Sequence, residues 1–189
     1  GSLPTLKNIE NVVIYDNKTV ANTATTVDLT KWDTVETLSL VRSTNAAAYV
    51  LGEKVTTVNI EDKAAVATTL TFDKDLTAAT VGVNNVTGAN NINVTNGGTA
   101  LKTLTVDAYG KASNVALVNT AIETLNITGK ANLTLDAANT SITSVKTVDG
   151  SKAQGNLTFT NTAAMTSIKT GSGNDTVTVA AVVASGETI

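Results

Sequence analysis

The sequence of 189 residues predicts an all-β fold, a parallel β-solenoid with about 22 residues per coil and two main strands per coil. Three observations support this fold class. The composition is repetitive, with 36 Thr, 25 Ala and 20 Asn, which is far from ordinary globular usage. A frame with the spacing apolar-x-x-apolar-x-apolar recurs with a period near 22 residues. A second, shorter alternating run lies between consecutive copies of this frame.

Each copy of the frame predicts the first strand of one coil, because alternating apolar residues are typical of a strand with one buried face. In chain order, the copies span residues 6–14, 32–40, 55–60, 101–106, 122–127, 142–145 and 165–168. The intervening runs predict the second strands, at residues 27–29, 50, 70–72, 92–94, 115–117, 133–135, 157–159 and 177–179. Asn, Gly, Asp and Ser flank both kinds of run and mark turns. Because no 3.6-residue apolar stripe persists, helices should be few.

Stacking of coils ~4.8 Å apart would align the same position of every repeat. We therefore expect sixteen short strands in two parallel sheets. The residues expected to face the core are Leu104, Val106, Leu125, Ile127, Leu133 and Leu135. In this register Leu125 lies between Leu104 and Val145. On the outer face Thr124 lies between Thr103 and Ser144.

Two other folds share parts of this pattern. Strands about every 8–12 residues also suit an antiparallel sandwich, but a sandwich gives no reason for one frame to return at a fixed period. Leucine-rich repeats use a similar apolar frame. The Asn or Cys that should follow it is missing, because Tyr109 and Gly110 follow one copy and Lys130 follows the next. The parallel solenoid is the prediction, and the sandwich is its alternative.

Composition also excludes several classes of site. The chain has no Cys and no His, which excludes the usual zinc and copper sites, disulfides and nucleophiles that need an imidazole or thiolate. A net charge of −3 with Arg42 as the single arginine lacks the basic footprint of a nucleic-acid-binding protein. No apolar run approaches the ~18 residues that cross a bilayer, so no membrane span is expected. We interpret Gly1-Ser2 as a cloning remnant and residues 3–189 as a single β-solenoid domain.

Two acidic groups, at residues 61–63 and 73–75, stand beside strand ends. A glycosidase needs two carboxylates that converge across a groove, whereas each of these groups falls in a repeat turn. Aromatic residues that could stack on sugars are scarce and scattered. We therefore predict that the chain is not an enzyme.

Outward threonines could form regular rows like those of ice-binding solenoids. The residues that interrupt these rows are Glu61, Asp107, Lys146 and Lys169. Because charged side chains would break a flat, uniform surface, ice binding is not predicted.

The sharpest local motif spans residues 170–178, with the sequence TGSGNDTVT. It matches the calcium-binding nonapeptide G-G-x-G-x-D-x-U-x at every defined position except the first, where Thr170 replaces Gly. Gly171 and Gly173 permit a tight turn, and Asp175 supplies a hard carboxylate oxygen of the kind that Ca²⁺ prefers. These three residues form a candidate half-site for weakly bound Ca²⁺. An ordinary Gly-Asn-Asp turn between strands is the other interpretation.

The motif, the Thr-, Ala-, Asn- and Val-rich composition, the lack of Cys and the segment 148–159 together resemble the β-solenoid parts of bacterial S-layer proteins and RTX-type surface adhesins. The resemblance implies a fragment of a longer, extracellular protein of the bacterial cell surface, exported by a type I system. It implies a structural component of an S-layer that assembles through lateral contacts with calcium support. The alternative is a stalk or ligand-binding module of an adhesin. Expected partners are further copies, other segments of the same protein, or a cell-surface glycan.

Overall fold

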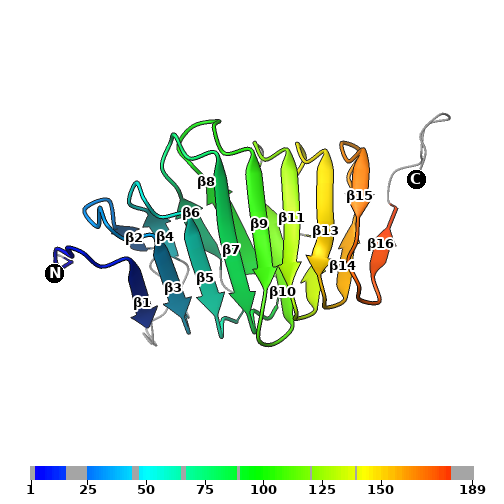
Figure 1. The fold of residues 1–189 in the computed structure, drawn as a ribbon, viewed down its shortest axis with the longest axis horizontal. Coiled ribbons are helices and arrows are strands. Elements are labelled where there is room, and N and C mark those ends of the chain that lie inside the picture. The colour runs from blue at the N-terminus through cyan, green and yellow to red at the C-terminus, as the bar shows by residue number, and fades with distance from the viewer. Residues whose placement is uncertain are drawn as a thin grey trace.

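A computed structural model describes residues 3–15, 25–43, 47–64, 67–88, 90–119, 121–138 and 140–179. Gly1 and Ser2, interpreted as a cloning remnant, lie outside these residues. The described residues form sixteen β-strands and no helix, and the strands stack in two eight-stranded sheets that face each other along the molecule (Figure 1). Every pairing between neighbouring strands is parallel. The prediction of a parallel β-solenoid is confirmed.

Odd-numbered strands form the first sheet and even-numbered strands the second, so the chain visits both sheets once per coil. The first sheet contains β1 (Asn11–Tyr15), β3 (Thr37–Val41), β5 (Thr57–Glu61), β7 (Ala78–Asn84), β9 (Thr103–Ala108), β11 (Thr124–Gly129), β13 (Thr147–Ala153) and β15 (Ser167–Lys169). The second contains β2 (Thr25–Asp28), β4 (Ala47–Val50), β6 (Thr68–Thr71), β8 (Asn90–Thr95), β10 (Ser113–Val118), β12 (Leu133–Leu135), β14 (Leu157–Thr160) and β16 (Thr176–Thr178).

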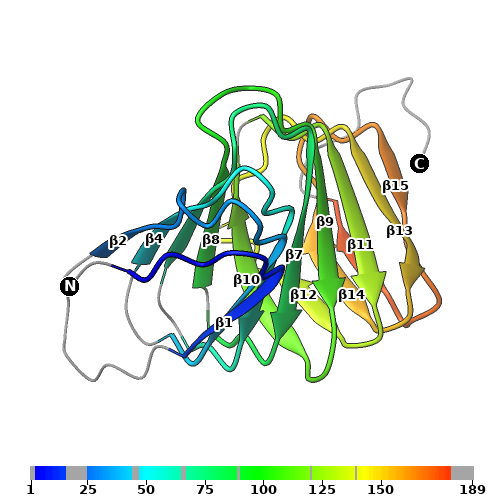
Figure 2. The same ribbon diagram turned by 60° about the vertical axis from the view of Figure 1, so that its left-hand side comes forward.

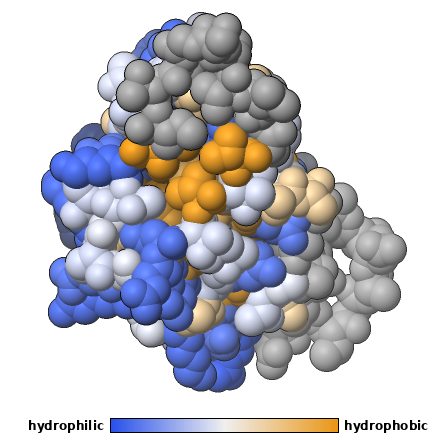
Figure 3. Space-filling view, turned by 90° about the vertical axis from the view of Figure 1, so that its right-hand side faces the viewer, coloured by the Kyte–Doolittle hydropathy of each residue, from blue (hydrophilic) through white to orange (hydrophobic). Residues whose placement is uncertain are grey.

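The core is a set of aliphatic ladders between the two sheets, because each strand turns every second side chain inward. The predicted inward residues are all buried, with at most 3% of their surface exposed: Leu104, Val106, Leu125, Ile127, Leu133 and Leu135. Four aromatic side chains are buried in the same core: Trp32, Tyr49, Phe72 and Phe159. Each inner coil is supported only by its two neighbours, as in other solenoids. β15 and β16 end their sheets, and apolar side chains are visible among polar ones at this end of the stack (Figure 3).

The predicted register is correct on one side of β11 and wrong on the other. Leu125 pairs with Leu104 as expected, but its second partner is Val148 and not Val145. Likewise Thr124 pairs with Thr103 and with Thr147, not with Ser144. The cause is the long connection 136–146 between β12 and β13. Coils average about 23 residues and vary in length.

A turn in this connection imitates the apolar frame. Ile142 is 2% exposed, and its carbonyl accepts a hydrogen bond from the backbone N–H of Val145 at 3.2 Å. The pair therefore has the three-residue spacing of the frame, although it lies in a tight turn before the strand. The expected strands do not include β7. Leu76, Ala79 and Val81 have the spacing of the frame, but the small side chain of Ala79 stands where other copies carry a larger apolar residue.

The N-terminal segment crosses the first end of the solenoid before it enters β1 (Figure 2). The indole Nε1–H of Trp32 donates a hydrogen bond to the carbonyl of Pro4 at 2.9 Å, and Leu6 packs against the core. Thr34 exchanges two hydrogen bonds with the backbone of Ile9. Among the described residues, no helix is long and apolar enough to span a bilayer.

Candidate functional site

The calcium-motif residues lie in the connection between β15 and β16, at the C-terminal end of the stack. This connection repeats the conformation of the two before it. The backbone N–H of Ser172 donates to the carbonyl of Ala153 at 3.1 Å, as that of Gln154 donates to Gly129 at 2.7 Å. Asparagines stack beside them: the N–H of Asn174 donates to Oδ1 of Asn156 at 2.9 Å, and the N–H of Asn156 to Oδ1 of Asn132 at 2.8 Å.

Close stacking between coils accounts for both glycines of the motif. A Cβ added to Gly171 would lie 1.9 Å from the carbonyl oxygen of Ala153, and one added to Gly173 would lie 2.5 Å from that of Gly155. No side chain fits at such distances. The glycines therefore let this turn approach the preceding coil, whether or not an ion is held.

Asp175 also makes a hydrogen bond to the preceding coil. Its Oδ1 accepts a hydrogen bond at 2.8 Å from the backbone N–H of Leu157, which begins β14. The structure thus brings Gly171, Gly173 and Asp175 together in one turn, as predicted. In the described part of the chain, no group of three or more carboxylates converges on one point. Calcium binding here remains a prediction, with the remaining oxygens to come from backbone carbonyls and water.

The variant Asp175→Asn separates the two roles of this side chain. An amide Oδ1 can still accept the hydrogen bond from Leu157, but it removes the charge that attracts Ca²⁺. We expect the natural chain and the variant to have the same melting temperature in EDTA. In 5–10 mM CaCl₂ the melting temperature of the natural chain alone should rise by a few degrees. That gain follows from mass action at a dissociation constant of ~10⁻⁴–10⁻³ M. Equal gains in both proteins would show that Ca²⁺ binds elsewhere in the chain. No gain in either protein would show that the turn has a structural role only.

The two acidic groups considered as catalytic candidates form local turn contacts. Oδ1 of Asp73 accepts the backbone N–H of Asp75 at 2.9 Å, and Lys74 and Asp75 form an exposed ion pair. Oδ1 of Asp62 accepts from the Asn85 side chain at 2.8 Å on the next coil. Neither group lines the depression around Glu123 or the smaller one between Leu135 and Phe159.

The sequence did not single out an open depression of about 630 Å³ on the edge where the second sheet leads back to the first. Its floor is the short connection 119–123, and the longer connections 96–102 and 136–146 stand on either side. Buried Asn119 shapes the floor, because its Oδ1 accepts the backbone N–H groups of Ala121 and Ile122 at 2.6 and 2.7 Å. Its Nδ2 donates to the carbonyl of Val94 at 2.6 Å.

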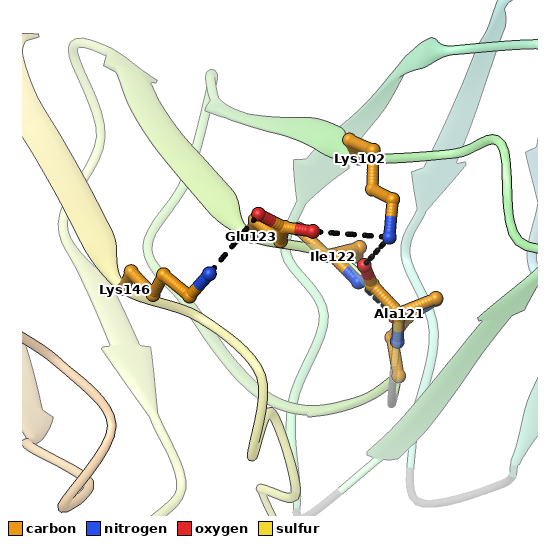
Figure 4. A network of polar contacts seen from close by, with 6 residues as sticks. Lys102, Ala121, Ile122, Glu123 and Lys146 are labelled. Carbon is orange, nitrogen blue, oxygen red and sulfur yellow. Dashed lines mark hydrogen bonds and ion pairs between the residues drawn. The ribbon is translucent and has the colours of Figure 1, made fainter.

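Glu123 lies at the centre of this depression between two lysines from the neighbouring coils (Figure 4). Its Oε1 is 3.0 Å from Nζ of Lys102, and its Oε2 is 3.3 Å from Nζ of Lys146. Lys102 Nζ also donates to the carbonyl of Ala121 at 3.4 Å. Hydrogen bonds from Lys102 and then Lys146 hold the pKa of Glu123 below its ordinary value.

The depression carries one more positive than negative charge, and hydroxyl groups surround it. Thr99, Thr143 and Thr166 contribute these hydroxyls. Ammonium groups bind anions, and a carboxylate accepts hydrogen bonds from hydroxyl groups. Threonine hydroxyls both donate and accept hydrogen bonds. The arrangement suits a hydroxyl-rich ligand that bears a negative charge.

Comparisons with known proteins identify no relative. No family model matches the sequence, and neither a curated protein nor a solved structure is significantly similar to it.

Proposed function

We propose that this chain is a structural component of a bacterial surface layer, an S-layer, that assembles through lateral contacts with calcium support. The observation that carries the proposal is the pair of continuous parallel sheets, which give the molecule two long outer faces (Figure 1). Such faces suit side-by-side packing of copies. The composition and the RTX-like turn support an extracellular location on the bacterial cell surface, and lack of Cys agrees with passage through an export channel.

A non-catalytic role accords with the site geometry. The carboxylates that flank strand ends close turns or pair with neighbouring side chains, and the depression around Glu123 holds no second carboxylate. General acid–base catalysis needs a positioned pair of proton donor and acceptor. We therefore propose that the chain acts by binding, to copies of itself or to other segments of the same surface protein.

The test is the oligomeric state of the intact chain in EDTA and in millimolar CaCl₂, measured by size-exclusion chromatography with light scattering. We expect a monomer in EDTA and a mass that rises with protein concentration in CaCl₂. A lattice contact can be weak alone, because many contacts act together in an array. A strict monomer at every concentration and calcium level would contradict the S-layer role and favour the adhesin alternative.

The depression around Glu123 favours one second function, a ligand-binding module of an RTX-type adhesin. Lys102 and Lys146 reach it from separate coils and keep 48% and 63% of their side chains exposed. Their charges and the surrounding hydroxyls fit an acidic cell-surface glycan. Affinity would be in the millimolar range, because the site is open and lacks an aromatic platform.

The glycan interpretation predicts selective binding of an acidic oligosaccharide. A galacturonic acid oligomer should shift the NMR resonances of residues around Glu123, whereas a neutral glucose oligomer should not. The double variant Lys102→Gln/Lys146→Gln should weaken this binding at least tenfold, because it removes both cations. Lys130→Gln is the matched control, since Lys130 is exposed on a connection of the opposite edge. Equal binding of both sugars, or of both variants, would exclude this site.

A further inference from the structure

We infer that the outer face of the second sheet is the surface on which a second copy of this chain packs. The inference rests on the proposed function, because it assigns the lateral contact to one face. We call this surface the neutral face. It is represented by the outward residues of its C-terminal half: Asn114, Thr134, Thr158, Thr160, Thr176 and Thr178.

The two sheets differ sharply in charge. The strands β4, β6, β8, β10, β12, β14 and β16 of the second sheet contain no charged residue, and its first strand, β2, ends in exposed Asp28. Four strands of the first sheet do: β5 carries Glu61, β9 Asp107, β13 Asp149 and Lys152, and β15 Lys169. Apart from Asp28, the charged side chains within strands therefore all lie on the first sheet.

Register makes the neutral face a regular array. Asn114, Thr134, Thr158 and Thr176 follow one another in one row across four strands, and Thr160 pairs with Thr178 in a second row. Neighbouring strands lie about 4.8 Å apart, and alternate residues of a strand about 6.7 Å apart. Thr158, Thr176 and Thr178 are exposed. The result is a grid of hydroxyl groups on a parallel sheet.

A second copy is the occupant that this chemistry fits best. Burying a charged side chain in an interface costs desolvation free energy unless that charge is paired, and charged residues are depleted from interface cores. The outer face of the first sheet would incur this cost at several side chains, whereas the neutral face carries one charged residue, Asp28, at its N-terminal end. Hydroxyl and amide groups both donate and accept hydrogen bonds. A grid of such groups is therefore complementary to its own copy.

The size of the neutral face predicts a weak contact. Seven steps of about 4.8 Å by four residues of about 3.3 Å give roughly 450 Å² per copy, below the ~800 Å² per partner of stable complexes. Contacts of this size suffice where many are repeated in an array. We therefore expect association only at high protein concentration.

The test places two lysines in one row of the neutral face. Thr158→Lys/Thr176→Lys puts two positive charges on neighbouring strands of the second sheet, and Thr57→Lys/Thr80→Lys does the same on the outer face of the first. All three proteins are compared by sedimentation velocity over a range of concentrations in CaCl₂. Thermal melting ensures that each variant is folded. We expect Thr158→Lys/Thr176→Lys to raise the dissociation constant at least tenfold, and the control to associate like the natural chain.

The outcomes separate this inference from the proposed function. If Thr158→Lys/Thr176→Lys still associates like the natural chain, or if only the control variant fails to associate, the neutral face is not the contact surface. The proposed structural function is not affected by either result. A natural chain that never associates overturns both. If the double variant does not fold, Thr158→Lys alone replaces it, because a single lysine on this exposed site has no like-charged neighbour within the sheet.

Discussion

Replacing Leu125 by Asp is expected to unfold the middle of the solenoid. Leu125 is 1% exposed and stacks between Leu104 and Val148. Removing a buried leucine side chain alone costs ~2–5 kcal/mol, and burying an unpaired carboxylate adds several more. Because typical domains are stable by only ~5–15 kcal/mol, we expect loss of the β-sheet signal in circular dichroism, or a melting transition lowered by tens of degrees.

Thr124→Asp is the matched control, because it places the same charge one residue earlier. Thr124 faces outward beside Thr103 and Thr147 and is half-buried. Surface substitutions of this kind usually change stability by ~0.5 kcal/mol or less. Equal destabilisation by the two variants would mean that Leu125 does not face the core, and would refute the alternation on which the fold rests.

Strand positions could be predicted because stacking imposes the same requirement on every coil. A buried ladder needs an apolar residue at each step, so positions such as Leu104 and Leu125 repeat in sequence as they repeat in space. Register is less predictable, because it depends on the length of each connection. Ile142 and Val145 satisfied the sequence frame although they lie in a turn before β13. Only the pairing of Leu125 with Val148 resolves the ambiguity.

The two candidate sites differ in how far they could be predicted from the sequence, for the same reason. Gly171, Gly173 and Asp175 belong to one connection, so a local motif could bring them together. Lys102, Glu123 and Lys146 belong to three different coils and meet only through register, since the N–H of Glu123 donates to the carbonyl of Lys102 at 2.8 Å. No short motif can encode such a site. It could be found in sequence only once the coil boundaries were known.

Gly129→Ala is expected to be the most damaging change that adds a single methyl group. Gly129 ends β11 with a φ of +101°, a conformation that L residues rarely adopt. An added Cβ would lie 2.0 Å from the carbonyl oxygen of Ala108 on the neighbouring coil. Backbone strain of ~1–2 kcal/mol and overpacking of ~1–3 kcal/mol together predict a loss near 3 kcal/mol. At ~2–4 °C per kcal/mol for a domain of this size, the melting temperature should fall by about 6–12 °C.

Gly97→Ala isolates the conformational part of this effect, so its difference from Gly129→Ala measures the steric part. Gly97 also has a positive φ, +61°, but a Cβ added to it would meet nothing within 4 Å, and the residue is exposed. Its replacement should cost only the conformational strain of ~1–2 kcal/mol, so its melting temperature should stay clearly above that of Gly129→Ala. If the two variants melt together, the coils at Ala108 and Gly129 are free to move apart. Close contact between turns would then not be what requires glycine there, and the same explanation for Gly171 and Gly173 would fail with it.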